Sequence, residues 1–198
     1  MREDAKETLR AIHDIGNNLE DFISFLQTAF IYNKVAPLRD VKERIDSLKK
    51  LILSVTEKIV IIARDDPHMR HYVTIPTNLL RITENIEKIS ELISTKIKED
   101  LLFSDRAISE ITFLLQRITD ILRPTSDIIL APNAILGNYI RESEAGIVRR
   151  AIDYATLHEE RLIEGLCLPK ASALYINILD AIKNIAWHCK EIANKVAP

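Results

Sequence analysis

The sequence is poor in the residues that turn a chain sharply. Its 198 residues include only 4 Gly and 7 Pro, and this scarcity argues against an all-β chain with many tight turns. The residues that dominate instead, among them Leu, Ala, Glu, Lys and Arg, favour helices. Ile is frequent as well, but it recurs at helical spacings, and spacing outweighs propensity. Composition therefore predicts an all-α protein.

Cysteine and runs of like charge are also scarce. The two cysteines, Cys167 and Cys189, form no disulfide framework, and we interpret them as reduced thiols at or near a helix interface. The net charge is -2, and no block of five like charges occurs. Because proteins that bind nucleic acids neutralise phosphates with Lys and Arg, this balance argues against a nucleic-acid partner.

Long apolar runs are missing too. The longest uncharged stretch, residues 128–140, is interrupted by Pro132 and Gly137, and it is shorter than the about 20 apolar residues that cross a bilayer. The N-terminal residues enter a charged amphipathic pattern directly, without the profile of a signal peptide. We therefore expect a cytoplasmic protein that does not insert into a membrane.

Apolar residues return every three or four positions in six stretches, which predicts six long amphipathic helices. We expect them at about residues 4–33, 38–64, 67–97, 104–139, 142–166 and 169–197. The second helix has the cleanest stripe, which consists of Val41, Ile45, Leu48, Ile52, Val55, Ile59 and Ile62. The fifth has the weakest, which consists of Val148, Ile152, Ala155, Leu162 and Leu166.

Prolines and capping residues mark the predicted boundaries. Asp66 and Pro67 form a start signal for the third helix, which Pro76 should kink because proline lacks an N–H donor. Pro124 and Pro132 should kink or split the fourth helix, which begins at the capping pair Ser104 and Asp105. On the sixth helix Trp187 lies beside the stripe, and we expect it to be buried against another helix.

Six such helices predict a simple architecture. A helix of about 27 residues is about 40 Å long, and helices with one apolar stripe each bury those stripes only against one another. We expect antiparallel helices in two three-helix repeats, residues 1–99 and 100–198, which together form one elongated helical domain. Apolar residues beside the main stripes leave room for a homodimer.

The two halves of the chain carry an internal repeat. Residues 79–89 read LLRITENIEKI and residues 179–189 read LDAIKNIAWHC, and each segment belongs to the third helix of its half. A fainter copy lies at residues 9–15. A repeat of this length indicates duplicated helical units.

Three segments carry a resemblance to a known family. Residues 62–70, IARDDPHMR, are similar to the turn that ends the second helix of PhoU proteins, and residues 80–84 and 180–184 are similar to their Glu/Asp-x-x-x-Asp motifs. The chain thus resembles the PhoU family, whose members are built as two three-helix repeats and regulate phosphate uptake. The resemblance implies a non-enzymatic regulator that modulates phosphate transport or signalling through protein–protein contacts. Its partner would be a phosphate transporter component or a sensor histidine kinase.

The resemblance also implies candidate metal ligands, because members of the family can bind iron or zinc through the motif acids. The corresponding residues here are Asp14, Glu84, Asp180 and Asn184. Both motifs are incomplete, since Leu80 replaces the first acid of one and Asn184 the second acid of the other. Hard metal ions prefer several converging oxygen ligands. An iron- or zinc-binding helical bundle is therefore the alternative function, and a solvated helix face is the alternative interpretation of these residues.

A second candidate site lies at the turn before the third helix. Asp65, His68 and His71 could hold a metal or an anion there, or they could form a polar turn with local capping. The sequence predicts no catalytic residues. His158 lacks the second histidine of a zinc-protease motif, no Glu-x-x-His pattern occurs, and the four glycines are too scattered for a phosphate-binding loop.

Overall fold

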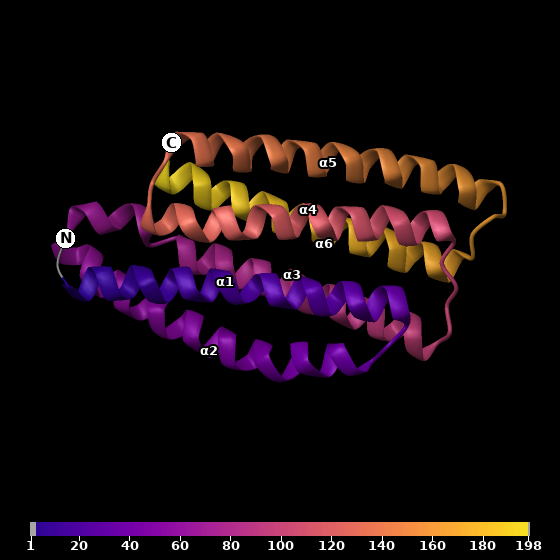
Figure 1. The fold of residues 1–198 in the computed structure, drawn as a ribbon, viewed down its shortest axis with the longest axis horizontal. Helices are drawn as coiled ribbons and strands as arrows, with labels where there is room; N and C mark the ends of the chain where they lie inside the picture. Colours follow the sequence, from indigo (N-terminus) through magenta and orange to yellow (C-terminus); the bar gives the residue numbers. More distant parts are fainter. Residues whose placement is uncertain (1–2, 198) are drawn as a thin grey trace.

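The computed structural model describes residues 3–197, which fold into six long α-helices laid side by side (Figure 1). They are α1 (Glu3–Tyr32), α2 (Ala36–Asp65), α3 (Ile75–Lys98), α4 (Asp105–Leu130), α5 (Ala134–Ile163) and α6 (Pro169–Val196), with a 3-10 helix, η1 (Pro67–Tyr72), between α2 and α3. The described residues include no strand, so the predicted all-α class is confirmed. Within them, no helix has the length and apolar character needed to cross a membrane.

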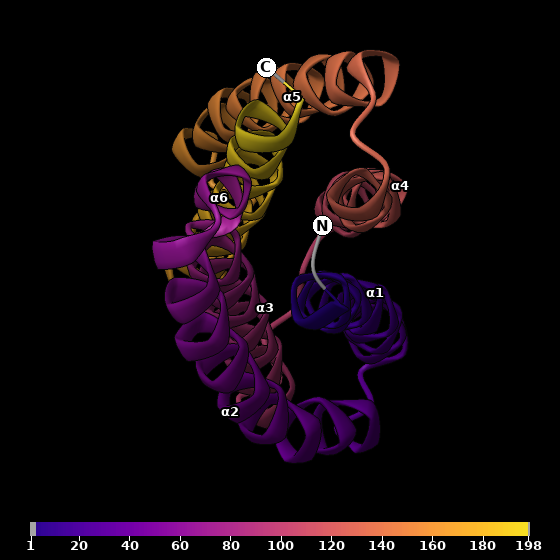
Figure 2. The ribbon, with the colours of Figure 1, turned by 90° about the vertical axis from the view of Figure 1, so that its left-hand side faces the viewer.

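The helices from the two halves of the chain share one core. Viewed from the end in Figure 2, α2, α3, α6 and α5 follow an arc, and α1 and α4 lie on its concave side. The most extensive packing joins α1 to α4 and α3 to α6. Buried apolar residues of all six helices form a single cluster.

The predicted stripes account for most of that core. Every residue of the α2 stripe, from Val41 to Ile62, is buried. Helix α1 buries a wide apolar face, which includes Ile12, Ile15, Leu19 and Ile23. The reason is that α1 contacts α2, α3 and α4, and a helix with several neighbours needs a wider apolar face.

The predicted start of the third helix and its predicted kink are wrong, although the cap by Asp66 is confirmed. Pro76 kinks no helix, because α3 begins only at Ile75 and a proline in the first turn loses no helical hydrogen bond. Asp66 does cap the backbone N–H of His68, at 3.0 Å, but the element that follows is η1 and not α3. The first half therefore has a short connecting helix where the pattern predicted one continuous helix.

The start of α5 also differs from the prediction. Pro132 splits the predicted fourth helix, and the side chain of Asn133 accepts hydrogen bonds from the N–H groups of Ile135 and Leu136, at 2.8 and 3.2 Å. This N-cap starts α5 at Ala134, eight residues earlier than predicted. Pro124 lies inside α4, whose predicted cap is confirmed because Ser104 accepts from the N–H of Ala107 at 3.2 Å.

The predicted stripe of α5 has the wrong phase. Ile152 is 53% exposed, whereas Ile147, Ala151 and His158 are buried. The true inner face also includes Gly137 and Glu144. A search for apolar periodicity misses a face that is made partly of small and polar residues.

Helices α1 and α4 approach each other closely at Gly16. A Cβ atom built on Gly16 would overlap the Oγ of Ser126 and lie 3.1 Å from its Cβ. Glycine in the middle of a helix is otherwise unfavourable by about 1 kcal/mol relative to alanine. The close contact explains its presence.

We expect Gly16→Ala to lower the free energy of unfolding by about 1–3 kcal/mol, because the added methyl group overpacks the contact with α4. Urea denaturation followed by circular dichroism measures this change. The matched control is Gly146→Ala on α5, where nothing lies within 4 Å of the added Cβ; it should raise stability by about 0.5–1 kcal/mol through helix propensity. Equal stabilisation by both substitutions would show that the α1–α4 contact imposes no steric limit.

Candidate functional site

The two motif segments meet where α3 packs against α6. The side-chain amide of Asn184 donates to Oδ1 of Asn85 at 3.4 Å, and Nδ1 of His188 lies 2.9 Å from Oδ1 of Asn78. The earlier α3 residue contacts the later α6 residue, so the two helices run antiparallel. We call these four residues the α3/α6 seam. Its contacts between the helices are made by amides and an imidazole, and not by paired carboxylates.

The acids beside the seam are neutralised within their own helices. Glu84 pairs with Arg81 at 2.9 Å, and Asp180 pairs with Lys183 at 2.7 Å. Both pairs have the i,i+3 spacing that places side chains on one helix face. A metal ion would therefore have to displace Arg81 or Lys183 to bind these carboxylates.

Asp14 lies apart from these residues, on α1. Its carboxylate is 3.2 Å from Nδ1 of His13, whose Nε2 is 3.3 Å from a carboxylate oxygen of Asp127 on α4. The structure thus places Asp14 at the α1–α4 contact and the other three metal candidates near α3 and α6. Within residues 3–197, no three His, Cys, Asp or Glu side chains gather closely enough to hold a metal.

His188 is held in a neutral state at the seam. Burial lowers its pKa, and the positive charge of Arg81 lowers it further against the opposing effect of Glu191 and Glu84. The neutral ring of His188 can then donate a hydrogen bond from Nδ1–H to the side-chain carbonyl oxygen of Asn78. The neighbouring Trp187 is 45% exposed and lies edge-on to His188 at 4.7 Å, so the predicted burial of this tryptophan is wrong. The buried face of α6 passes through Ile185 and Cys189 and leaves position 187 outside.

The second candidate site lies on the surface between α2 and α3. Asp65 is the last residue of α2, and His68 and His71 are exposed residues of η1. The capping contact here comes from Asp66. Ligand binding by Asp65, His68 and His71 stays a prediction.

Metal binding by the motif residues has a direct test. Because Arg81 and Lys183 already pair with Glu84 and Asp180, we expect protein that is loaded with iron or zinc and then dialysed to retain less than one metal ion per chain. Elemental analysis measures this content. Stable retention that Glu84→Ala or Asp180→Ala abolishes would contradict our expectation and support the iron- or zinc-binding alternative.

A buried ionic cluster joins the three helices of the second half. Glu110 of α4 is buried, and both of its oxygens accept hydrogen bonds from Arg161 of α5, at 3.1 and 2.8 Å. The hydroxyl of Tyr175 on α6 donates to the same carboxylate, and Arg106 donates at 3.1 Å. A bidentate guanidinium–carboxylate pair is directional, and it therefore fixes the relative positions of the helices.

Sequence reasoning missed this cluster. The available signal was that Glu110 stands between Ala107 and Leu114 on the inner face of α4, where an acid is unusual. Arg106 is four residues away on the same helix, but the partners on the other helices, Arg161 and Tyr175, are 51 and 65 residues away along the chain. No local spacing connects these two residues to Glu110.

The ionisation of Glu110 is governed by two opposing effects. Burial by itself would raise the pKa of this carboxyl group, but hydrogen bonds from Arg161, Tyr175 and Arg106 outweigh burial and hold the pKa below its usual value. Burial and the same carboxylate raise the pKa of Tyr175, so its hydroxyl remains a donor.

We therefore expect stability to depend on the ionised form of Glu110. The unfolded chain has a glutamate pKa of about 4.3, so this contribution is complete above that pH and is lost as the pH falls through the lower folded value. Glu110→Ala should cost about 3–5 kcal/mol, because it leaves the partly buried guanidinium of Arg161 without its partner. Glu110→Gln should lose stability less steeply than the wild type as the solution is acidified, in urea titrations at several pH values. The control Glu159→Gln, at an exposed position of α5, should follow the wild-type profile.

Comparison with known proteins agrees with this architecture. No family model matches the sequence, and no curated protein matches it. The structure is similar to the crystal structure of PhoU from Pseudomonas aeruginosa, with a TM-score of 0.87 over 98% of this chain and 95% of that chain, at 16% sequence identity. The chain is thus an all-α, six-helix protein with the PhoU-like fold that the sequence resemblance predicted.

Proposed function

We propose that this protein is a non-enzymatic helical adaptor that regulates phosphate transport or phosphate signalling through protein–protein contacts. The observation that carries the proposal is the similarity in fold to PhoU over 98% of the chain, together with the PhoU-like segments of the sequence. We place the protein in the cytoplasm. Its partner would be a phosphate transporter component or a sensor histidine kinase. A fold alone does not establish a function. Further support comes from the residues that are exposed on the surface.

A groove between α4 and α5 is suited to a protein partner. It has a volume of about 240 Å3. Phe113 and Tyr139 line it, and each is 43% exposed. The guanidinium of Arg117 lies over the ring of Phe113 at 5.6 Å, and that of Arg150 lies over Tyr154 at 5.9 Å. Exposed aromatic rings and arginines are the residues that most often dominate binding energy at protein interfaces.

The charge of this groove indicates the kind of segment that would bind. Arg117 is paired with Asp120 at 3.0 Å, and Arg150 adds a further positive charge. The aromatic rings supply an apolar floor. A partner helix with an apolar face and acidic residues along its edge would match both features.

The experiment is a binding measurement with a purified phosphate transporter component and a sensor histidine kinase from the source organism. We expect one of them to bind the wild-type protein, and Phe113→Ala and Arg150→Glu each to weaken binding by tenfold or more, since truncation at an interface centre typically costs about 2 kcal/mol. Leu53→Ala is the matched control, because it removes a side chain that is 56% exposed on α2, in the other half of the chain.

Three outcomes separate the parts of this proposal. Binding that survives both groove substitutions would retain the adaptor function and place the interface elsewhere. Binding by neither protein would count against the partners. Unchanged phosphate uptake after deletion of the coding sequence would overturn the regulatory function itself.

A further inference from the structure

A pocket of about 510 Å3 lies between the first turns of α2 and the last turns of α3. The two helices run antiparallel, so these turns lie at the same end of the molecule (Figure 1). Residues between 35 and 45 line one side of the pocket, and residues between 87 and 98 line the other. The second stretch is about 16 Å long as a helix, and the volume is within the range of small-molecule sites. The pocket can therefore hold a ligand whose two ends differ.

One end of this pocket carries three cations that have no ionic partner. Arg39 and Lys42 come from α2, and Lys98 is the last residue of α3. None of them pairs with an acid within residues 3–197. The backbone adds little here, because the N-terminus of α2 and the C-terminus of α3 carry opposite partial charges. A cavity lined by unpaired cations attracts anions, and Arg and Lys are the usual partners of phosphate groups.

The other end of the pocket carries acidic side chains. Glu87 is neutralised by Lys49 of α2 at 2.5 Å, and this pair shows that later residues of α2 face earlier residues of α3. Glu91 lies one turn from Glu87 and has no ion pair with any residue of the described range. Three unpaired cations thus face one unpaired acid, and the pocket is positive overall. A carboxylate only accepts hydrogen bonds, so Glu91 suits the hydroxyl groups of a ligand.

Two serines lie between these ends on one face of α3. Ser94 is one turn before Lys98, and Ser90 is one turn before Ser94. Ser90 is only 8% exposed, yet neither serine hydroxyl forms a hydrogen bond within residues 3–197. In the same range, the side-chain polar atoms that are both unpartnered and sealed from solvent belong to Thr112, His158 and Arg161. The oxygen of Ser90 is therefore reached from the pocket, where a ligand or water supplies the partner it needs.

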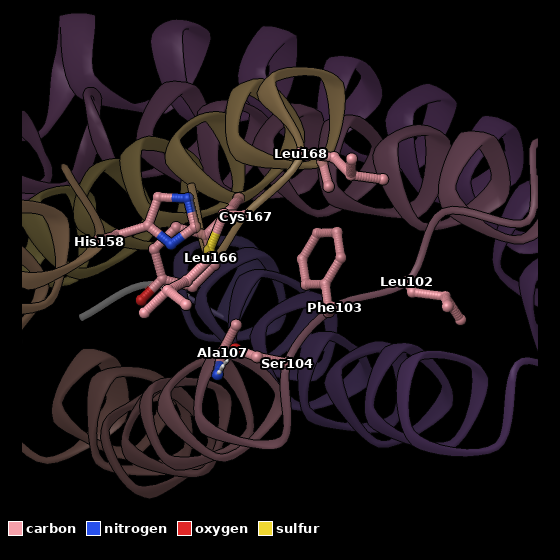
Figure 3. Close-up of a pocket in the computed structure, with 10 residues that line it drawn as sticks. Leu102, Phe103, Ser104, Ala107, His158, Leu166, Cys167 and Leu168 are labelled. Atoms are coloured by element: carbon pink, nitrogen blue, oxygen red, sulfur yellow. Dashed lines mark hydrogen bonds between the residues drawn. The ribbon is translucent and has the colours of Figure 1, made fainter. Parts of the chain in front are cut away.

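A second pocket shows what this arrangement adds. It has a volume of about 310 Å3 and lies between the connection from α3 to α4 and the connection from α5 to α6 (Figure 3). Its lining is mostly apolar and includes Leu102, Phe103 and Leu166, and none of the ten residues drawn in Figure 3 is Lys, Arg, Asp or Glu. The pocket between α2 and α3 also has an apolar wall, from Leu38 and Ile45. It adds to that wall the charged groups that select an anion.

We propose that the pocket between α2 and α3 binds a phosphorylated polyol, such as a sugar phosphate. The three cations contact the phosphate group, whose tetrahedral oxygens accept hydrogen bonds from donors on both helices. Ser90 and Glu91 form hydrogen bonds with the hydroxyl groups, and the C–H groups of the ligand lie against Leu38 and Ile45. A ligand of this kind explains why an unpaired acid lies beside unpaired cations. The site goes beyond the proposed adaptor function and does not rest on it.

The test compares glucose 6-phosphate with its two parts, glucose and inorganic phosphate. In 15N-labelled protein, we expect glucose 6-phosphate at concentrations up to about 10 mM to saturate shifts of the backbone amide signals of Ser90 and Ser94. Each part should bind about tenfold more weakly or worse, because it meets only one end of the pocket. No saturable binding of glucose 6-phosphate, or equally strong binding of inorganic phosphate, would overturn the proposal. Shifts confined to the pocket of Figure 3 would overturn it as well.

Two substitutions assign the binding to the two ends of the pocket. Lys42→Gln should weaken the binding of glucose 6-phosphate by about tenfold, which corresponds to the loss of one hydrogen bond to a charged group. Ser90→Ala should weaken it by about threefold or more and leave the weak binding of inorganic phosphate unchanged. The controls Lys50→Gln and Ser47→Ala, at exposed positions of α2 outside the pocket, should bind like the wild type. Wild-type affinity of Lys42→Gln or Ser90→Ala, when circular dichroism shows the variant to be folded, would overturn the proposal.

Discussion

The burial of α1 against α4 and of α3 against α6 is the constraint on which the remaining structure depends. These contacts join the two halves of the chain, and they exist because helices with one apolar face each have no other way to remove it from water. Burying one Leu or Ile side chain is worth about 1.5–3 kcal/mol, and the core includes such residues from every helix. The close approach of Gly16 to Ser126 follows from the same contact.

That packing also buries polar groups, and each of them needs a hydrogen-bonding or ionic partner. Glu110 remains ionised inside the second half because Arg161, Tyr175 and Arg106 all donate to it. The same Arg161 donates to Nδ1 of His158, so the hydrogen of the neutral ring is carried by Nε2. One arginine therefore balances a buried charge and fixes the tautomer of a neighbouring histidine.

At the α3/α6 seam the fold is PhoU-like, but the residues differ from the paired acids of the PhoU motifs. The PhoU-like fold brings the two motif segments together, yet amides and an imidazole make the contacts here, and the nearby acids pair with Arg81 and Lys183. The similarity to PhoU thus concerns the architecture.

Local pattern was sufficient for the class of fold, for the number of long helices and for most of the core. The stripe of α2 and the cap at Ser104 were predicted because apolar periodicity and N-caps depend only on residues within a few turns of one helix. The phase of α5 was predicted wrongly because its inner face contains two polar residues, Glu144, which pairs with Lys190 of α6, and His158, which stacks on Tyr175 of α6. The tertiary structure alone decided that Arg161 and Tyr175 meet Glu110, since helix packing brings them together from positions 51 and 65 residues away along the chain.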